Sequence, residues 1–196
     1  MKQLARIAGL ATVVALFLVG CGDSSVSSEE NGVECGVSGM FRDVRDGQTY
    51  EYVTIDSTIW MTQNLNYAAD SSQCYGGLDE NCAQYGRLYL QHLAEESCPP
   101  GWVLPSYADA KSLIANGASA LLASGTNTTG FSALLGGSSN GNMGIYGIYW
   151  ISQNGYNIRV GILDNYVGVF LGADGELTSV RCVYESRCGQ SSSLGR

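Results

Sequence analysis

Seven cysteines restrict the folds open to this chain of 196 residues more than any other feature. One of them, Cys21, stands apart near the start, and the other six are spread over residues 35–188: Cys35, Cys74, Cys82, Cys98, Cys182 and Cys188. No two of the six have the spacing of about two to four residues that structural zinc sites prefer, and His92 is the only histidine. An even number of cysteines in an oxidising compartment favours three disulfides around one small core.

The first 20 residues indicate that the chain is exported. A short basic start with Lys2 and Arg6 precedes an apolar run over residues 10–19, which is the order typical of a cleaved signal peptide. The string Leu18-Val19-Gly20-Cys21 resembles a bacterial lipobox. The resemblance implies cleavage before Cys21, a diacylglycerol on its sulfur and an acyl chain on its amino group.

Two or three acyl chains make membrane attachment effectively permanent. The alternatives are an ordinary signal peptide and a membrane-spanning helix, but the apolar run is shorter than the roughly 20 residues that a span needs. We therefore expect a lipoprotein of the cell envelope, anchored through Cys21 and located at the outer membrane.

Composition divides the rest of the chain. Residues 21–34 are mostly Ser, Gly, Asn and acid, so they read as a flexible tether, residues 35–188 form a single domain, and residues 189–196 form a disordered tail. Removal of residues 1–20 takes away two basic residues and no acid, which changes the formal net charge from -8 to -10. Because such a surface repels phosphate backbones, we expect no nucleic-acid partner.

The first half of the domain reads as strands followed by a loop. Alternating runs at residues 41–45 and 48–55 flank Asp46-Gly47 and predict a tight β-hairpin, with a third strand at residues 58–61. Residues 62–86 are rich in Asn and Gly and predict a long loop. Residues 86–90 fit either a short strand or the start of a helix.

The second half begins with the best helix of the mature chain. Ser106 as N-cap, with Asp109 three residues later, predicts a helix over residues 107–116 that stops at Gly117. A short helix at residues 118–123 and a loop over residues 125–147 follow. Turn signals then separate four short runs, which predict an antiparallel meander: residues 149–152, 157–163, 166–171 and 178–184. Strands at both ends around a central helix give an α+β fold.

Six cysteines allow fifteen pairings, and the sequence alone does not choose among them. We favour a local clasp between Cys74 and Cys82 that holds the long loop. For the other two bridges we favour Cys98 with Cys182 and Cys35 with Cys188, so that the middle and the start of the domain are tied to its end.

Several strings resemble the Fibrobacter succinogenes major paralogous domain. They cover residues 41–184 in the order of that family: Asp43-Val44-Arg45-Asp46-Gly47-Gln48-Thr49-Tyr50, Trp60-Met61-Thr62-Gln63-Asn64-Leu65-Asn66-Tyr67, Tyr85-Gly86-Arg87-Leu88-Tyr89, Cys98-Pro99-Pro100-Gly101-Trp102-Val103-Leu104-Pro105-Ser106, Gly130-Phe131-Ser132-Ala133-Leu134, Tyr149-Trp150-Ile151-Ser152 and Ser179-Val180-Arg181-Cys182-Val183. Where members of that family often carry His and Trp, this chain has Val103 and Ala110.

The family is distantly similar to the C-type lectin-like and formylglycine-generating enzyme folds. The resemblance implies antiparallel sheets, paired N- and C-terminal strands, one main helix after a Leu-Pro-Ser string, and long loops. It would place Cys98 near the helix start and Cys182 on the last strand, which supports bridging them. Family members are typically secreted or lipid-anchored, and their biochemical role is largely unassigned.

No catalytic or metal motif is evident. The Glu-Pro-Asn and Trp-Asn-Asp strings of calcium-dependent lectins are absent, although oxygen ligands could come from four residues near the end: Asp164, Asn165, Asp174 and Glu176. A serine triad lacks support, because His92 is the only histidine and no Gly-x-Ser-x-Gly elbow occurs. Copper chemistry of the formylglycine-generating type would need reduced cysteines, whereas we expect all six cysteines of the domain to form disulfides. We therefore expect no enzyme activity, no cofactor and no metal.

Binding is the better supported class. Aromatic and amide side chains stand among glycines in the second half: Tyr146, Tyr149, Asn154, Tyr156, Asn157 and Asn165. Rings supply contact area and amides supply hydrogen bonds, a combination suited to a polysaccharide or an envelope protein. The alternatives are that these residues serve the core and the turns of a purely structural envelope component, or that the chain is an enzyme.

Overall fold

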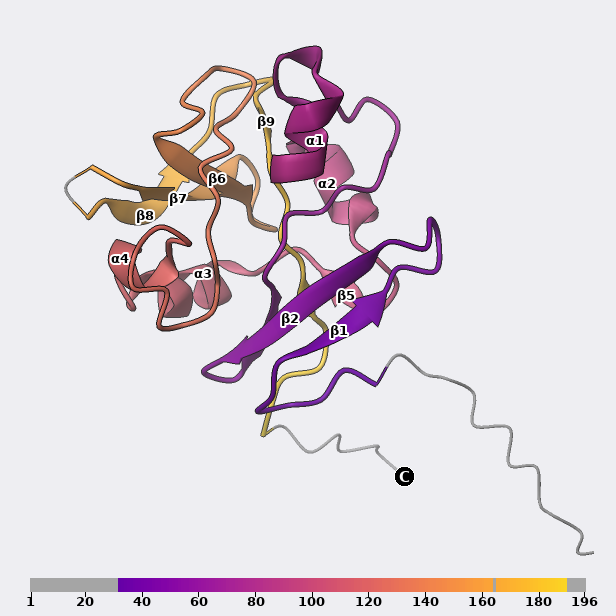
Figure 1. Cartoon of the computed structure of the whole chain (residues 1–196), viewed down its shortest axis with the longest axis vertical. Coiled ribbons are helices and arrows are strands. Elements are labelled where there is room, and N and C mark those ends of the chain that lie inside the picture. Colours follow the sequence, from indigo (N-terminus) through magenta and orange to yellow (C-terminus); the bar gives the residue numbers. More distant parts are fainter. Residues whose placement is uncertain (1–31, 164, 190–196) are drawn as a thin grey trace, which may run out of the picture. The chain divides into compact units, whose positions relative to one another are not determined.

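The computed structural model describes residues 32–163 and 165–189 (Figure 1). The expected signal peptide at residues 1–20, the lipidation residue Cys21, the tether up to residue 31, Asp164 and the tail from residue 190 lie outside the described residues. The described part is α+β, with antiparallel sheets, short helices and three disulfides. No helix within it is long and apolar enough to cross a membrane.

The largest sheet joins both ends of the described chain. Its five strands are antiparallel neighbours in the order β1 (Gly39–Arg42), β2 (Thr49–Ile55), β3 (Thr58–Met61), β10 (Val183–Tyr184) and β5 (Trp102–Val103). The C-terminal strand therefore pairs with β3 and β5, while β1 lies at the sheet edge. We expected N- and C-terminal strands to pair. The strand that pairs with the C-terminal β10 is β3, and β1 pairs only with β2.

The turn between β1 and β2 corrects the predicted tight hairpin. Arg42 pairs with Thr49, so six residues connect the strands where a two-residue Asp-Gly turn was predicted. The buried Asp43 explains the difference, because its carboxylate accepts hydrogen bonds from the backbone and the guanidinium of Arg45. Gly47, at a φ of +77°, closes this wider loop.

A second sheet holds β6 (Tyr146–Trp150), β7 (Tyr156–Gly161) and β8 (Val167–Leu171), all antiparallel. The predicted fourth strand of this meander is wrong, because residues 178–184 do not join it as a strand. They divide into β9 (Leu177–Thr178), which pairs with β4 (Tyr89–Leu90), and β10 of the first sheet. The first meander strand also begins three residues earlier than predicted, at Tyr146.

The helices are short. The capping box at Ser106 and Asp109 is present as predicted and starts α3 (Tyr107–Ile114), which ends two residues early. The predicted loop at residues 62–86 also contains a 3-10 turn, η1 (Tyr75–Gly77), and α1 (Asp79–Tyr85). An unpredicted helix, α2 (Gln91–Ser97), follows β4, and α4 is a single turn (Ala118–Leu121). Figure 1 shows α3 and α4 beside the β6 to β8 sheet.

Three disulfides link these elements, and they are the pairs favoured from the sequence. Cys35 bonds to Cys188, Cys98 to Cys182, and Cys74 to Cys82. The core forms two clusters: one around Trp102 and Trp150 beneath the large sheet, and one around Trp60, Phe131 and Tyr149 that reaches the second sheet. The bridge from Cys98 to Cys182 is part of the first cluster.

Candidate functional site

The six residues proposed from the sequence as ligand contacts lie on or beside the β6 to β8 sheet, but in different environments. Tyr149 is in the core, where its hydroxyl donates to the Leu134 carbonyl and accepts from the Leu134 N–H, each at 3.0 Å. Burial raises the pKa of Tyr149. Because Leu134 already fills both the donor and the acceptor role of the buried Tyr149 hydroxyl, the structure removes Tyr149 from the candidate set.

The remaining five proposed residues lie in three places. Tyr156 is half-buried against the second core cluster, and Asn154 is exposed in the turn before it. Asn165 is exposed and its Oδ1 accepts from the Ser119 N–H, which fixes the β7 to β8 turn to α4. Tyr146 and Asn157 lie on the opposite face of the sheet from Tyr149, which we call the outer face.

A row of aromatic rings covers part of the outer face. The centroids of Tyr146 and Tyr166 are 5.5 Å apart, and those of Tyr166 and Phe170 are 5.2 Å apart with nearly parallel planes. Two glycines bring the rings close to the backbone: a Cβ at Gly161 would lie 2.6 Å from the Tyr146 ring, and one at Gly168 would lie 2.7 Å from Phe170. Glycine is needed at both positions because any side chain would displace a ring.

Arg159 adds a cation to this row. Its guanidinium carbon is 5.5 Å from the Phe170 centroid, and its Nε donates to Asn157 Oδ1 at 3.0 Å. Its Nη2 is 4.0 Å from a carboxylate oxygen of Glu176, which is itself held by the Ser138 hydroxyl and the Ala173 N–H. Arg159 therefore connects the rings to a polar cavity at the end of the sheet.

The cavity next to these groups has a volume of about 430 Å³. Its wall comes from α2, the β6 to β7 turn and the segment after β8: Leu90, Gln91, His92, Trp150, Gly155, Leu171, Gly172, Ala173, Asp174, Gly175 and Glu176. Asn157 stands directly behind this wall, because a Cβ at Gly172 would lie 2.8 Å from its Nδ2. That Nδ2 is buried and has no hydrogen-bond partner.

An unpaired buried donor normally costs about 1–3 kcal/mol, so the unpaired Asn157 amide needs an explanation. It lies behind Gly172, at a cavity lined in part by Gln91, His92 and Asp174, so a ligand hydroxyl reaches it only when the backbone at Gly172 moves aside. We call the ring row together with this cavity the outer-face site.

The outer-face site offers little chemistry beyond binding. In the described part of the chain, no group of three or more His, Cys, Asp and Glu residues has the arrangement of a metal site. Of the four oxygen ligands considered from the sequence, Asn165 is bonded to α4, Asp174 and Glu176 line the cavity wall, and Asp164 lies outside the described residues. The carboxylate of Glu176 already has two donors and a nearby guanidinium.

The sequence pointed to this region but missed most of the site. The site residues that were not selected are Tyr166, Phe170, Arg159 and His92. Their signal was weak because each is a single residue in a short strand, a short helix or, for Tyr166, the turn before β8. The glycines at 161 and 168 within strand-like runs were the usable signal, since glycine in a strand marks a close approach. No protein-family model matches the chain, and neither the curated proteins nor the solved structures compared with it include a match.

Proposed function

We propose that this chain is a lipid-anchored protein of the cell envelope that binds a neutral polysaccharide through its outer-face site. Its domain would belong to the Fibrobacter succinogenes major paralogous family and share the C-type lectin-like topology. The anchor is a lipid on Cys21 and the location is the outer membrane. The proposal includes no catalytic step, no cofactor and no resident metal.

The observation that carries the proposal is the combination of flat rings with an unpaired amide on one sheet face. Tyr166 stacks on Phe170 and meets Tyr146 edge to face, and Asn157 Nδ2 is a buried donor without a partner near the end of this ring row. Aromatic faces contact the apolar side of a sugar ring, while amides and Arg159 bind its hydroxyls. A chain of sugars running from the rings to the cavity would use both groups.

Charge favours a neutral polymer over an acidic one. The mature chain would carry a formal net charge of -10, and the cavity wall contains Asp174 and Glu176. Because like charges repel, an acidic polysaccharide would bind less well at low salt. An envelope protein partner is the second candidate, supported by exposed apolar residues beside the sheet: Ile145, Ile162, Leu163 and Leu171.

Pull-down of the full chain, purified in mild detergent, tests the proposal on insoluble cellulose and xylan. Phe170→Ala removes one ring of the row, and Asn157→Ala removes the unpaired amide. Tyr107→Ala is the matched control, because Tyr107 is 45% exposed on α3 and outside the outer-face site. We expect saturable retention that falls roughly tenfold in both site variants and is unchanged in the control. If both site variants are retained as well as the control, the proposal of polysaccharide binding at this face is wrong.

A further inference from the structure

A second cavity lies between the first sheet and α1, away from the outer-face site. It has a volume of about 340 Å³ and is lined by residues from β2, the loop after β3, α1 and the 125–145 segment: Gln48, Thr49, Tyr50, Gln63, Asn64, Asn66, Cys82, Ala83, Gln84, Tyr85, Gly86 and Leu134. None of these residues is charged at neutral pH, in a chain with a formal net charge of -8. We call it the amide cavity, because five of its lining side chains are Asn or Gln.

Asn66 leaves an acceptor without a partner in this cavity. Its backbone N–H donates to the Tyr50 hydroxyl at 3.0 Å, and its carbonyl accepts from Gln48 Nε2 at 3.2 Å. The loop is therefore fixed on both sides, yet Asn66 Oδ1 is buried and has no hydrogen-bond partner. Because Asn66 lines the cavity, a rotation of its side chain would bring this oxygen to a group that enters and donates a hydrogen bond.

The floor of the amide cavity is rigid. Asn64 donates to the Tyr85 carbonyl at 2.7 Å and to the Ser179 hydroxyl at 3.2 Å, and its Oδ1 accepts from the guanidinium of Arg181 at 2.7 Å. Both Asn64 and Arg181 are buried. Because the Asn64 side chain is already occupied on both ends, it shapes the cavity, and the ligand contacts fall to the other amides.

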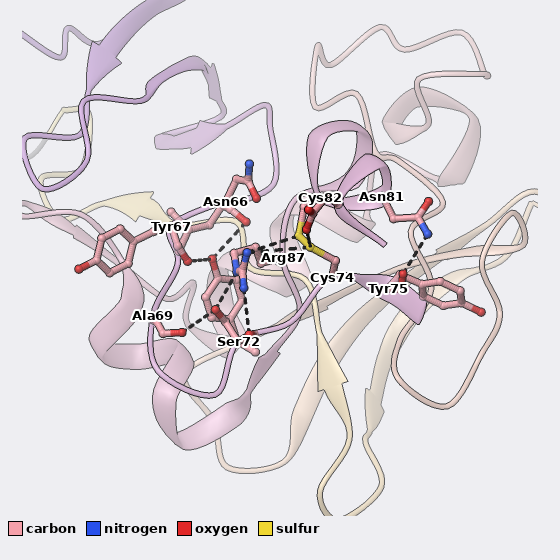
Figure 2. The surroundings of a disulfide bond; sticks show 12 residues. Asn66, Tyr67, Ala69, Ser72, Cys74, Tyr75, Asn81, Cys82 and Arg87 are labelled. Carbon is pink, nitrogen blue, oxygen red and sulfur yellow. Dashed lines mark hydrogen bonds between the residues drawn. A yellow bond between two sulfur atoms is a disulfide. The ribbon is translucent and has the colours of Figure 1, made fainter. Parts of the chain in front are cut away.

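The α1 wall is held by a covalent clasp. Cys82 lines the cavity and bonds to Cys74, eight residues earlier. Figure 2 shows Arg87 reaching this disulfide: its Nη1 lies 3.7 Å from Cys82 Sγ, while its Nε donates to the Ser72 hydroxyl at 2.8 Å. At the end of α1, Gly86 has a φ of +71°, and a Cβ there would lie 2.7 Å from the Leu65 carbonyl oxygen. The end of α1 therefore packs closely against Asn64 and Leu65 at Gly86, and the Cys74–Cys82 disulfide fixes the middle of the helix.

We propose that the amide cavity is a separate binding site for a short neutral saccharide, and that the Cys74–Cys82 clasp maintains it. A sugar hydroxyl can donate to Asn66 Oδ1, whereas a carboxylate has no proton to give. Gln63 and Gln84 are exposed at the rim. Gln63 Oε1 already accepts from the Glu51 N–H at 2.8 Å, which leaves its Nε2 to donate, while the Gln84 amide can both donate and accept, as a hydroxyl partner requires. The volume is at the lower end for small-ligand pockets and suits a chain end better than a long polymer.

Calorimetric titration of the full chain in mild detergent tests this site with cellotriose, xylotriose and maltotriose, and with trigalacturonate as the charged probe. Ala83→Trp places a large ring on the cavity side of α1, and Asn66→Ala removes the unpaired acceptor. Glu80→Trp is the matched control, because Glu80 is exposed on the same helix and does not line the cavity. We expect one neutral trisaccharide to bind, roughly tenfold weaker binding in both cavity variants, and no change in the control.

Three results would overturn the assignment: no binding of any neutral probe, preference for trigalacturonate, or equal affinity in Ala83→Trp and the unmodified chain. The clasp is tested with Cys74→Ser combined with Cys82→Ser, which we expect to lose trisaccharide binding. Retention of the polymer by the same variant would show that the outer-face site still folds. Trisaccharide binding that persists without the clasp refutes the role of the disulfide, and the Ala83→Trp result decides the site even if the double variant does not fold.

Discussion

Arg181→Met is the sharpest test of how this fold is held together. Arg181 is fully buried, and it forms no salt bridge within the described residues. Its Nε donates to Asn64 Oδ1, its Nη1 to the Phe131 carbonyl and its Nη2 to the Ser132 carbonyl. Its guanidinium carbon also lies 4.4 Å from the Phe131 ring centroid. Burial lowers the pKa of Arg181, but a guanidinium remains charged at neutral pH.

The expected loss of stability follows from these three acceptors. Methionine fills a similar volume but leaves Asn64 Oδ1 and both carbonyl oxygens without their donor, at about 1–3 kcal/mol for each group that stays buried. Removing the charge returns part of this, because a buried ion carries a desolvation penalty of several kcal/mol. The three acceptors together cost about 3–9 kcal/mol, and recovery of the desolvation penalty leaves an expected net loss of about 2–4 kcal/mol.

Guanidinium denaturation with the disulfides intact, followed by tryptophan fluorescence and near-ultraviolet circular dichroism, measures this loss. The control is Arg159→Met, since the Arg159 side chain is 28% exposed and its ion-pair contact is long. It removes the donor to the buried Asn157 Oδ1, against three acceptors for Arg181, and should cost about 1–2 kcal/mol. If Arg181→Met costs no more than Arg159→Met, then the buried guanidinium does not hold the 131–132 segment, and the reasoning is wrong.

Three further outcomes follow from single features. Ser106→Ala breaks the capping box of α3 and should lower the free energy of unfolding by about 1 kcal/mol in the same assay, while an unchanged value would contradict the capping argument. Replacing Cys98 and Cys182 with serine opens a bridge across 84 residues and should cost roughly 4–5 kcal/mol in the chain-entropy model, with a lower melting temperature as the readout. Burial raises the pKa of Tyr50 to about 12. Because the folded-state pKa lies above the unfolded value near 10, the stability due to neutral Tyr50 is complete below about pH 10 and is lost as the pH rises towards 12. Tyr50→Phe should flatten the stability profile in that window, and an unaltered profile would refute the assignment.

The predictable parts of the fold are those with strong local chemistry. Ser106 and Asp109 form both bonds of a capping box, so α3 could be predicted from four residues. The wide β1 to β2 turn could not, because Asp46-Gly47 carries the usual signal of a tight turn, and the competing bonds to Asp43 involve a side chain that becomes buried only after folding. At this turn the Asp-Gly motif favours a two-residue connection, but the hydrogen bonds of the buried Asp43 stabilise the longer loop that forms.

The missed helices lacked any such local signal. The N-cap residues of α1 and α2 are Leu78 and Leu90, and neither helix has a side-chain cap bond. Helices of seven residues are too short to form alone, so their stability must come from their surroundings. For α1 these include the Cys74–Cys82 bond, which the sequence placed in a loop.

The candidate site was predicted as a region and not as a set of residues. An alternating strand sends neighbouring residues to opposite faces, and Tyr149 and Asn157 could not be assigned to a face without the register of β6 and β7. That register puts Tyr149 in the core with Ile158, its cross-strand neighbour, and leaves Asn157 behind the outer-face cavity. Composition identified the strands rich in aromatic and amide side chains, but only strand pairing determines which of these residues a ligand can reach.

The glycine-rich segment at residues 125–145 connects the two proposed sites. Few of its side chains are large, so its order depends on individual long-range bonds: Arg181 holds the Phe131 and Ser132 carbonyls, and the Ser138 hydroxyl donates to Glu176 at 2.7 Å. Leu134 from this segment lines the amide cavity, and Glu176 lines the outer-face cavity. Because one buried cation fixes the start of the segment and one buried carboxylate fixes its middle, the shape of each cavity depends on polar contacts in the core as well as on the residues that line it.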